Sequence, residues 1–287
     1  MFKQRVITAL ILAPLALMAV FYLPLAGFAL FISAAFLLGA WEWSGLCGLA
    51  SKAMRWVYVM LTAIILALLY WQWPAPLHWP VEQNVLLSTL LLAGIGWWVL
   101  AIVLVLTYPK SQKLWAGSDW GKALMGWLTL IPAWVAVLFI RSTDYAASNF
   151  TGAWLIFCLL ALVWAADIGG YIVGKPFGKH KLLPKVSPGK TVEGMLGGLA
   201  LVAIVVTIVA WLQDWPAQTG IWYVSALLLT VLSVFGDLTE SMFKRVAGKK
   251  DSGAFLPGHG GILDRIDSLT ATAPLFAIIV ALYGGFY

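Results

Sequence analysis

Residues 85–107 read VLLSTLLLAGIGWWVLAIVLVLT and contain no charged side chain. A helix needs about 20 apolar residues to cross the ~30 Å hydrocarbon core of a bilayer, and this run is long enough to do so. The rest of the chain has the same character, because 62% of its 287 residues are hydrophobic and only 10% are charged. Soluble domains are nearer ~45–50% apolar and ~25% charged. The sequence therefore predicts an all-α polytopic membrane protein.

Similar apolar runs recur along the chain. We predict nine transmembrane helices, at residues 6–22, 25–46, 56–72, 85–107, 123–141, 151–174, 192–213, 221–240 and 267–285. The first two are separated only by a short segment around Pro24, so they form either a tight helical hairpin or one broken helix. We expect a single membrane domain, 1–287. Residues 1–150 supply its N-terminal helices, and residues 151–287 supply the catalytic helices and loops.

The positions of the basic residues indicate how the chain crosses the membrane. If the N-terminus is cytoplasmic and the spans alternate, every one of the 18 lysines and arginines except Arg141 falls in a cytoplasmic segment. Lysine and arginine concentrate in cytoplasmic loops, so this orientation is favoured. The same bias explains the net charge of +6 without a nucleic-acid partner. Cys47 and Cys158 lie in apolar surroundings and are expected to be small core residues.

Two of the predicted cytoplasmic segments are rich in lysine, glycine and proline. They are Gly174–Thr191 and Glu240–Asp267. Long segments of this kind are usually functional or disordered, and the apolar residues within both argue against disorder. Ser187–Thr191 resembles the end of a P-loop, but Pro184 stands where that motif needs glycine. We therefore expect a cytoplasmic active-site cavity that is not a P-loop.

Several carboxylates lie at membrane depth. An ionised carboxylate in hydrocarbon needs a partner, a metal ion or water. For Asp167, within the sixth span, a helix-packing ion pair and a functional site are equally favoured. Asp237 and Asp264 flank the second basic segment, with Glu240 and Asp267 as further polar cavity residues. Paired carboxylates suit Mg²⁺, which takes oxygen ligands and keeps waters or substrate phosphates.

The basic and glycine-containing residues between these aspartates suit bound phosphates. Lysine and arginine neutralise phosphate charge, and glycine lets backbone N–H groups approach phosphate oxygens. For any single lysine, a role in topology or in contacting anionic lipid is the more common explanation. That explanation does not account for His259-Gly260-Gly261 or for the two flanking aspartates. The combination indicates phosphoryl or nucleotidyl transfer.

These motifs resemble those of phosphatidate cytidylyltransferases. The resemblance rests on Ser241–Arg245, Lys250-Asp251, Leu256–Gly261 and Asp264–Asp267, and on the upstream residues Asp167, Gly174-Lys175, Phe177–Lys181, Pro184, Ser187-Pro188 and Lys190-Thr191. The chain departs from the family pattern after the aspartate, where Ile168 replaces the frequent hydroxyl residue, and before the aromatic residue, where Gly170 replaces alanine. The resemblance is sharp over roughly the last 120 residues.

The resemblance implies that CTP and phosphatidic acid react to give CDP-diacylglycerol and pyrophosphate. It further implies a bacterial inner-membrane setting, a homodimer, and Mg²⁺ as cofactor with K⁺ as a candidate second ion. Asp237 and Asp264 are the expected metal ligands, with Lys244 and Arg265 also catalytic. The expected substrate-binding residues are Lys175, Lys179, Ser187, Lys190, Thr191, Arg245, Lys250, Asp251, His259, Gly260 and Gly261.

Two alternatives predict different behaviour. A related CTP-dependent lipid kinase or cytidylyltransferase would use the same site with another lipid acceptor. A transporter of anionic substrates would move its substrate without releasing pyrophosphate. It would also need charged residues along the outer half of the bundle, where the sequence has almost none.

Overall fold

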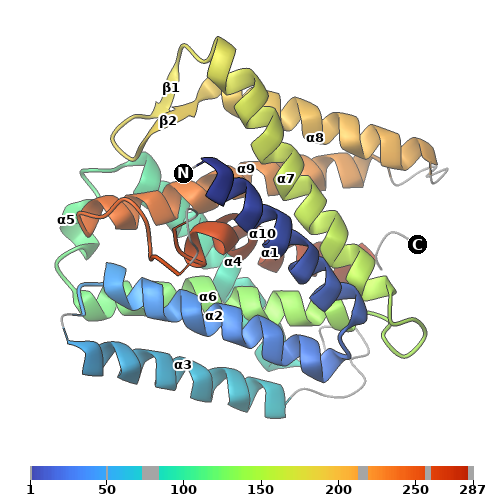
Figure 1. Cartoon of the computed structure of the whole chain (residues 1–287), viewed down its shortest axis with the longest axis horizontal. Helices are drawn as coiled ribbons and strands as arrows, with labels where there is room; N and C mark the ends of the chain where they lie inside the picture. Colours follow the sequence, from blue (N-terminus) through green and yellow to red (C-terminus); the bar gives the residue numbers. More distant parts are fainter. Residues whose placement is uncertain (1, 50, 73–83, 213–218, 256–259, 284–287) are drawn as a thin grey trace.

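The structure is a computed structural model that describes residues 2–49, 51–72, 84–212, 219–255 and 260–283 (Figure 1). Its elements in chain order are α1 (Phe2–Tyr22), α2 (Leu25–Leu46), α3 (Lys52–Trp71), α4 (Val85–Leu106), α5 (Gln112–Trp115), α6 (Asp119–Ser142), α7 (Thr151–Phe177), β1 (Lys181–Leu183), β2 (Ser187–Thr191), α8 (Val192–Leu212), α9 (Thr219–Val246) and α10 (Leu263–Tyr283). The expected helical membrane architecture is confirmed.

Eight helices in the described part of the chain are long and apolar enough to cross a membrane. They are α2, α3, α4, α6, α7, α8, α9 and α10. The first predicted span falls in α1, whose described apolar part, Leu10–Tyr22, is shorter. The total of nine spans therefore stays a prediction. The helices α1 and α2 are distinct and meet at Leu23-Pro24, where proline lacks the N–H that a continuous helix would use.

The helix α1 packs against α7 more than along α2 (Figure 1). Phe21 meets Trp154 edge-on, with ring centroids 5.0 Å apart. The buried Arg141, at the end of α6, donates from Nε to the Val20 carbonyl at 2.8 Å and from Nη2 to the Leu23 carbonyl at 3.1 Å. Arg141 thereby satisfies carbonyl groups left without helical partners at the end of α1.

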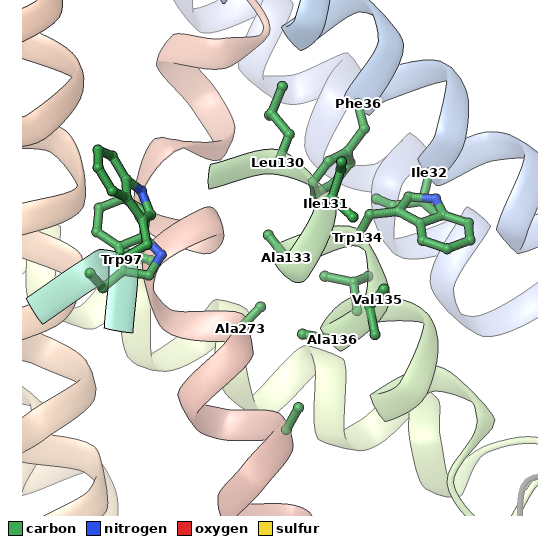
Figure 2. Close-up of a cluster of buried hydrophobic side chains, with 14 of the residues drawn as sticks. Ile32, Phe36, Trp97, Leu130, Ile131, Ala133, Trp134, Val135, Ala136 and Ala273 are labelled. Atoms are coloured by element: carbon green, nitrogen blue, oxygen red, sulfur yellow. The ribbon is translucent and has the colours of Figure 1, made fainter. Parts of the chain in front are cut away.

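The molecule is built around α6. In its most apolar stretch 78% of the residues are buried, against 28% for the peripheral α3. Figure 2 shows Trp134 of α6 beside Ile32 of α2, and Ala133 facing the side of α10 that carries Ala273. Buried indoles find hydrogen-bond acceptors, as Trp98 Nε1 does at the Thr270 carbonyl, 3.0 Å away.

Glycines set the crossing of α7 and α8. A Cβ on Gly169 would lie 2.5 Å from the Gly197 carbonyl oxygen, and one on Gly198 would lie 2.7 Å from that of Ala166. Small residues let membrane helices approach this closely. The two helices touch near the β-hairpin and diverge toward the other end of the bundle (Figure 1). This crossing holds the hairpin above the ends of α7 and α8.

The described parts of both predicted cytoplasmic segments contain more helix and strand than expected. In the first, α7 continues through Phe177, and β1 and β2 pair as an antiparallel hairpin with Lys181 opposite Thr191. In the second, α9 runs to Val246 and α10 begins at Leu263, so the connection between the two helices is only residues 247–262. Asp264 is consequently in the first turn of α10, where the helix dipole favours an acid.

The segments that carry most lysines and arginines lie at one end of the bundle, which we call the basic end. They are the connections after α2, α4 and α9 with the helix ends beside them, and the hairpin after α7 (Figure 1). Arg141 lies at the opposite end, beside the close of α1. The predicted separation of basic residues therefore exists in the fold.

Candidate active site

A cavity of about 450 Å³ opens between α7, the hairpin, α8 and α9. Its charged lining consists of Asp167, Lys175, Lys190 and Asp237, and it also contains Gly189 and Thr191 of β2. The structure thus brings the first predicted segment and two of the predicted intramembrane carboxylates to one place. The hairpin, which was expected only as a loop, supplies the residues on one side of the cavity.

Asp237 faces this cavity from α9. Its Oδ2 lies 2.7 Å from Lys190 Nζ, and its Oδ1 accepts a hydrogen bond from Ser241 Oγ at 3.2 Å. Lys190 comes from β2, far away in the sequence, and its ammonium also approaches the Val234 carbonyl at 3.5 Å. Asp167 lies within electrostatic range of Lys190 and Asp237. An ion pair therefore joins the hairpin to α9 in the cavity.

Asp264 occupies a more enclosed position. Its Oδ1 lies 2.6 Å from Lys244 Nζ. Its Oδ2 accepts hydrogen bonds from Gly261 N at 2.7 Å and from Ser252 Oγ at 2.9 Å. Gly260, the residue that precedes Gly261, has φ +81°, a backbone conformation that favours glycine. Asp264 thus fixes the connection between α9 and α10 as well as carrying charge.

Two further carboxylates connect these positions. Glu240 is 3% exposed and lies 3.5 Å from Lys244 Nζ. Asp267 lies beside Glu240 and within electrostatic range of Asp237. The charges of Asp237 and Asp264 therefore belong to one cluster, although Asp237 is part of the cavity lining and Asp264 is not. Each aspartate has its own lysine.

The cluster has donors that suit Mg²⁺. Within the described ranges, no three Asp, Glu, His or Cys side chains are grouped as a ready-made metal site. Mg²⁺ often uses only one or two protein carboxylates and takes its other ligands from water and substrate phosphates. The ammonium groups of Lys190 and Lys244 now balance the charges of Asp237 and Asp264. A shared ion on these two aspartates stays a prediction.

The other predicted site residues have varied surroundings. Lys175 Nζ bonds to Tyr171 OH at 2.7 Å, and Thr191 Oγ1 accepts from Gly194 N at the start of α8. Arg245 Nε donates to the Val186 carbonyl at 3.1 Å, which fastens α9 to the hairpin. The remaining ones lie in the hairpin (Lys179, Ser187), in the connection (Lys250, Asp251) and, exposed, on α10 (Arg265). His259 lies outside the described residues.

Comparisons with known proteins match almost the entire chain. The model of the cytidylyltransferase family matches residues 3–283. The chain belongs to this cytidylyltransferase family. It is 46% identical over 281 residues to the phosphatidate cytidylyltransferase of Pseudomonas aeruginosa, covering 98% of this chain and 97% of that one. It is 39% identical over 285 residues to that of Haemophilus influenzae, covering 96% and 98%.

The match extends beyond the region that sequence motifs had indicated. The phosphatidate cytidylyltransferase of Bacillus subtilis is also 36% identical over 229 residues, 78% of this chain and 80% of that one. We expected a sharp resemblance only over the last 120 residues or so, but the family match includes the N-terminal helices. Those helices also contribute to the site of this cytidylyltransferase.

Glu42 of α2 is the site residue that our sequence analysis missed. It is 1% exposed. Its Oε2 accepts hydrogen bonds from Leu263 N at 2.7 Å and Ser252 Oγ at 3.1 Å, and its Oε1 accepts from Ile262 N at 3.1 Å. A carboxylate at a helix N-terminus satisfies amides that lack helical partners. The sequence did contain a signal for Glu42, because it is an acidic residue inside an apolar span.

Proposed function

We propose that this cytidylyltransferase transfers a cytidylyl group from CTP to phosphatidic acid, giving CDP-diacylglycerol and pyrophosphate. The observation that carries the proposal is the cavity at the basic end of a membrane bundle, where Lys190 and Asp237 meet 2.7 Å apart. A lipid headgroup can reach such a cavity while its acyl chains stay in hydrocarbon. The family membership supports the nucleotide and the acceptor.

The reaction needs positioned charge more than it needs proton transfer. An anionic phosphate oxygen of the lipid attacks the α-phosphorus of CTP. A new P–O bond forms, the bond to the oxygen that bridges to the β-phosphorus breaks, and pyrophosphate leaves with that electron pair. The nucleophile is already ionised, so no strong general base is required. Fixed positive charge then stabilises the transition state.

The chain's own residues divide this work. Lys190, on β2, and Lys244, on α9, which pair with Asp237 and Asp264, would offset phosphate charge. Lys175, Lys179 and Thr191 surround the nucleotide from the hairpin side. Asp237 and Asp264 would hold Mg²⁺, which supplies Lewis-acid polarisation of the phosphate oxygens when bound. K⁺ is the proposed second ion, near the same acidic cluster.

The proposed setting is the bacterial inner membrane. The basic end would face the cytoplasm, where CTP is present and where lysine-rich loops are favoured. The family resemblance also leads us to propose a homodimer. Molar mass by light scattering in detergent tests the dimer. Protease accessibility of the 178–191 hairpin in inverted and right-side-out vesicles tests the orientation.

Pyrophosphate release by the purified protein tests the reaction. CTP, Mg²⁺ and phosphatidic acid are supplied together and then omitted one at a time. We expect release only when all three are present, with CDP-diacylglycerol formed in equal amount. Release that is independent of phosphatidic acid, or a phosphorylated lipid as product, would contradict the proposal. Several lipid acceptors assayed in parallel with labelled CTP identify the acceptor.

A further inference from the structure

A second cavity, of about 120 Å³, lies between α7, α8, α9 and α10. Almost all of its lining is apolar, including Cys158, Leu162, Val206, Leu229 and Phe276. Ser225 is a polar member of that lining. None of the described residues that line the cavity has a charged side chain. Its chemistry fits a hydrocarbon chain.

This cavity and the active-site cavity are both lined by α7, α8 and α9, at successive positions along these helices. On α7 the active-site cavity reaches Ala166 and the second cavity begins at Leu162; on α9 the corresponding residues are Val234 and Leu229. At ~1.5 Å per residue, these offsets are about 6–8 Å. On α7 and α9 the lining residues of the second cavity lie farther from the basic end than those of the active-site cavity.

We propose that the second cavity binds the distal part of one acyl chain of the lipid substrate, a proposal that rests on the proposed function. A lipid with its phosphate near Lys190 directs its chains away from the basic end, toward this cavity. Trp222, 5% exposed, lines the far part. It lies ~18 Å along α9 from Val234, so a short acyl chain does not fill the cavity.

The divergence of α7 and α8 gives the chain a way in. The two helices touch at their glycines near the hairpin and separate toward the opposite end (Figure 1). Phe157 and Val209, which border the cavity on α7 and α8, are only partly buried. A chain can therefore slide in sideways from the bilayer while the phosphate enters the polar cavity.

We expect occupation of this cavity to raise kcat/KM only modestly. The chain leaves lipid hydrocarbon and enters an equally apolar cavity, so the hydrophobic effect contributes little and packing supplies the difference. We expect kcat/KM for dipalmitoyl phosphatidate to exceed that for dioctanoyl phosphatidate by about three- to tenfold. Both lipids are compared at equal mole fraction in mixed micelles.

Filling the cavity tests the proposal. Ala161→Phe places a ring in the cavity from α7, and Ala200→Phe, at an exposed position on α8, is the matched control. Ala161→Phe should lower kcat/KM for the long-chain lipid about three- to tenfold and leave the short-chain value within twofold. The control should change neither. Equal loss on both lipids, no loss, or the same loss in the control would overturn the proposal.

A second measurement uses the unaltered protein and does not depend on activity. Phosphatidate with a diazirine near the end of one acyl chain is photolysed in its complex with the protein. We expect crosslinked peptides from residues 157–162 and 222–229. Crosslinks confined to lipid-facing positions such as Ile204 and Ile208 would overturn the acyl site. Absence of pyrophosphate release with either lipid would instead refute the proposed function.

Discussion

The two aspartates at the centre of the site are held in opposite ways. Asp237 lines an open cavity and has one lysine, from a two-stranded hairpin, and one serine as partners. Asp264 pairs with a lysine of α9 and accepts hydrogen bonds from a hydroxyl and a backbone amide of the connection between α9 and α10. Glu42 fastens that connection to α2. We expect the first arrangement to exchange partners when substrate binds. The second has its geometry fixed in advance.

This difference suggests a division of labour. Binding sites gain precision when supporting residues lock the groups that act. The Asp264 side, anchored through Glu42 and the start of α10, supplies that rigidity. The Asp237 side, where Lys190 reaches across from β2, supplies the adaptable contacts. Four predictions separate these roles, beginning with the largest expected effect.

Asp264→Asn should abolish the reaction. The amide has the same shape but cannot pair with Lys244 or hold a divalent ion. We expect pyrophosphate release to fall by about 10³-fold, at the upper end of what losing one transition-state contact costs. Gel filtration in detergent verifies that the protein still folds. Near-normal turnover by folded Asp264→Asn would refute a catalytic role for this carboxylate.

Lys190→Gln should lower kcat by about 10²-fold, because a positive charge beside the reacting phosphates is lost. It also leaves Asp237 without its ion pair. Lys185→Gln, an exposed lysine in the turn of the same hairpin, is the matched control and should stay within twofold. Equal losses in the two variants would mean that the hairpin contributes only general positive charge.

Glu42→Gln should have a smaller effect, about tenfold on kcat, typical of residues that orient a metal ligand. The KM for CTP should change little, since Glu42 contacts the connection and α10 rather than the cavity. The midpoint of thermal unfolding should also fall. Asp144→Asn, exposed at the other end of the bundle, is the control. A raised KM with unchanged kcat would argue against a positioning role.

The thiol of Cys47 should be inert. Burial raises the pKa of this thiol, at the end of α2, to about 12, so at pH 8 it is protonated and cannot attack a maleimide. In a Cys158→Ala background we expect no labelling of the native protein and full labelling after denaturation. Rapid labelling in the native state would show that the region around α2 opens.

The sequence predicted the features that depend on local composition. Apolar runs located the helices, and the charged motifs located Asp237, Lys190 and Asp264 correctly at the basic end. The contacts of Glu42 with residues 252, 262 and 263 could not be predicted, because nothing local links α2 to the start of α10. The hairpin was missed because Pro184 and Pro188 reduce the usual strand signal.

The central claim is that Asp237 and Asp264 serve one divalent ion despite their different surroundings. Equilibrium binding of Mn²⁺, followed by its electron paramagnetic resonance signal, tests this with the wild-type protein, Asp237→Asn and Asp264→Asn. We predict about one bound ion per chain in the wild type and at least about tenfold weaker binding in each variant. Wild-type affinity in either variant would contradict the claim.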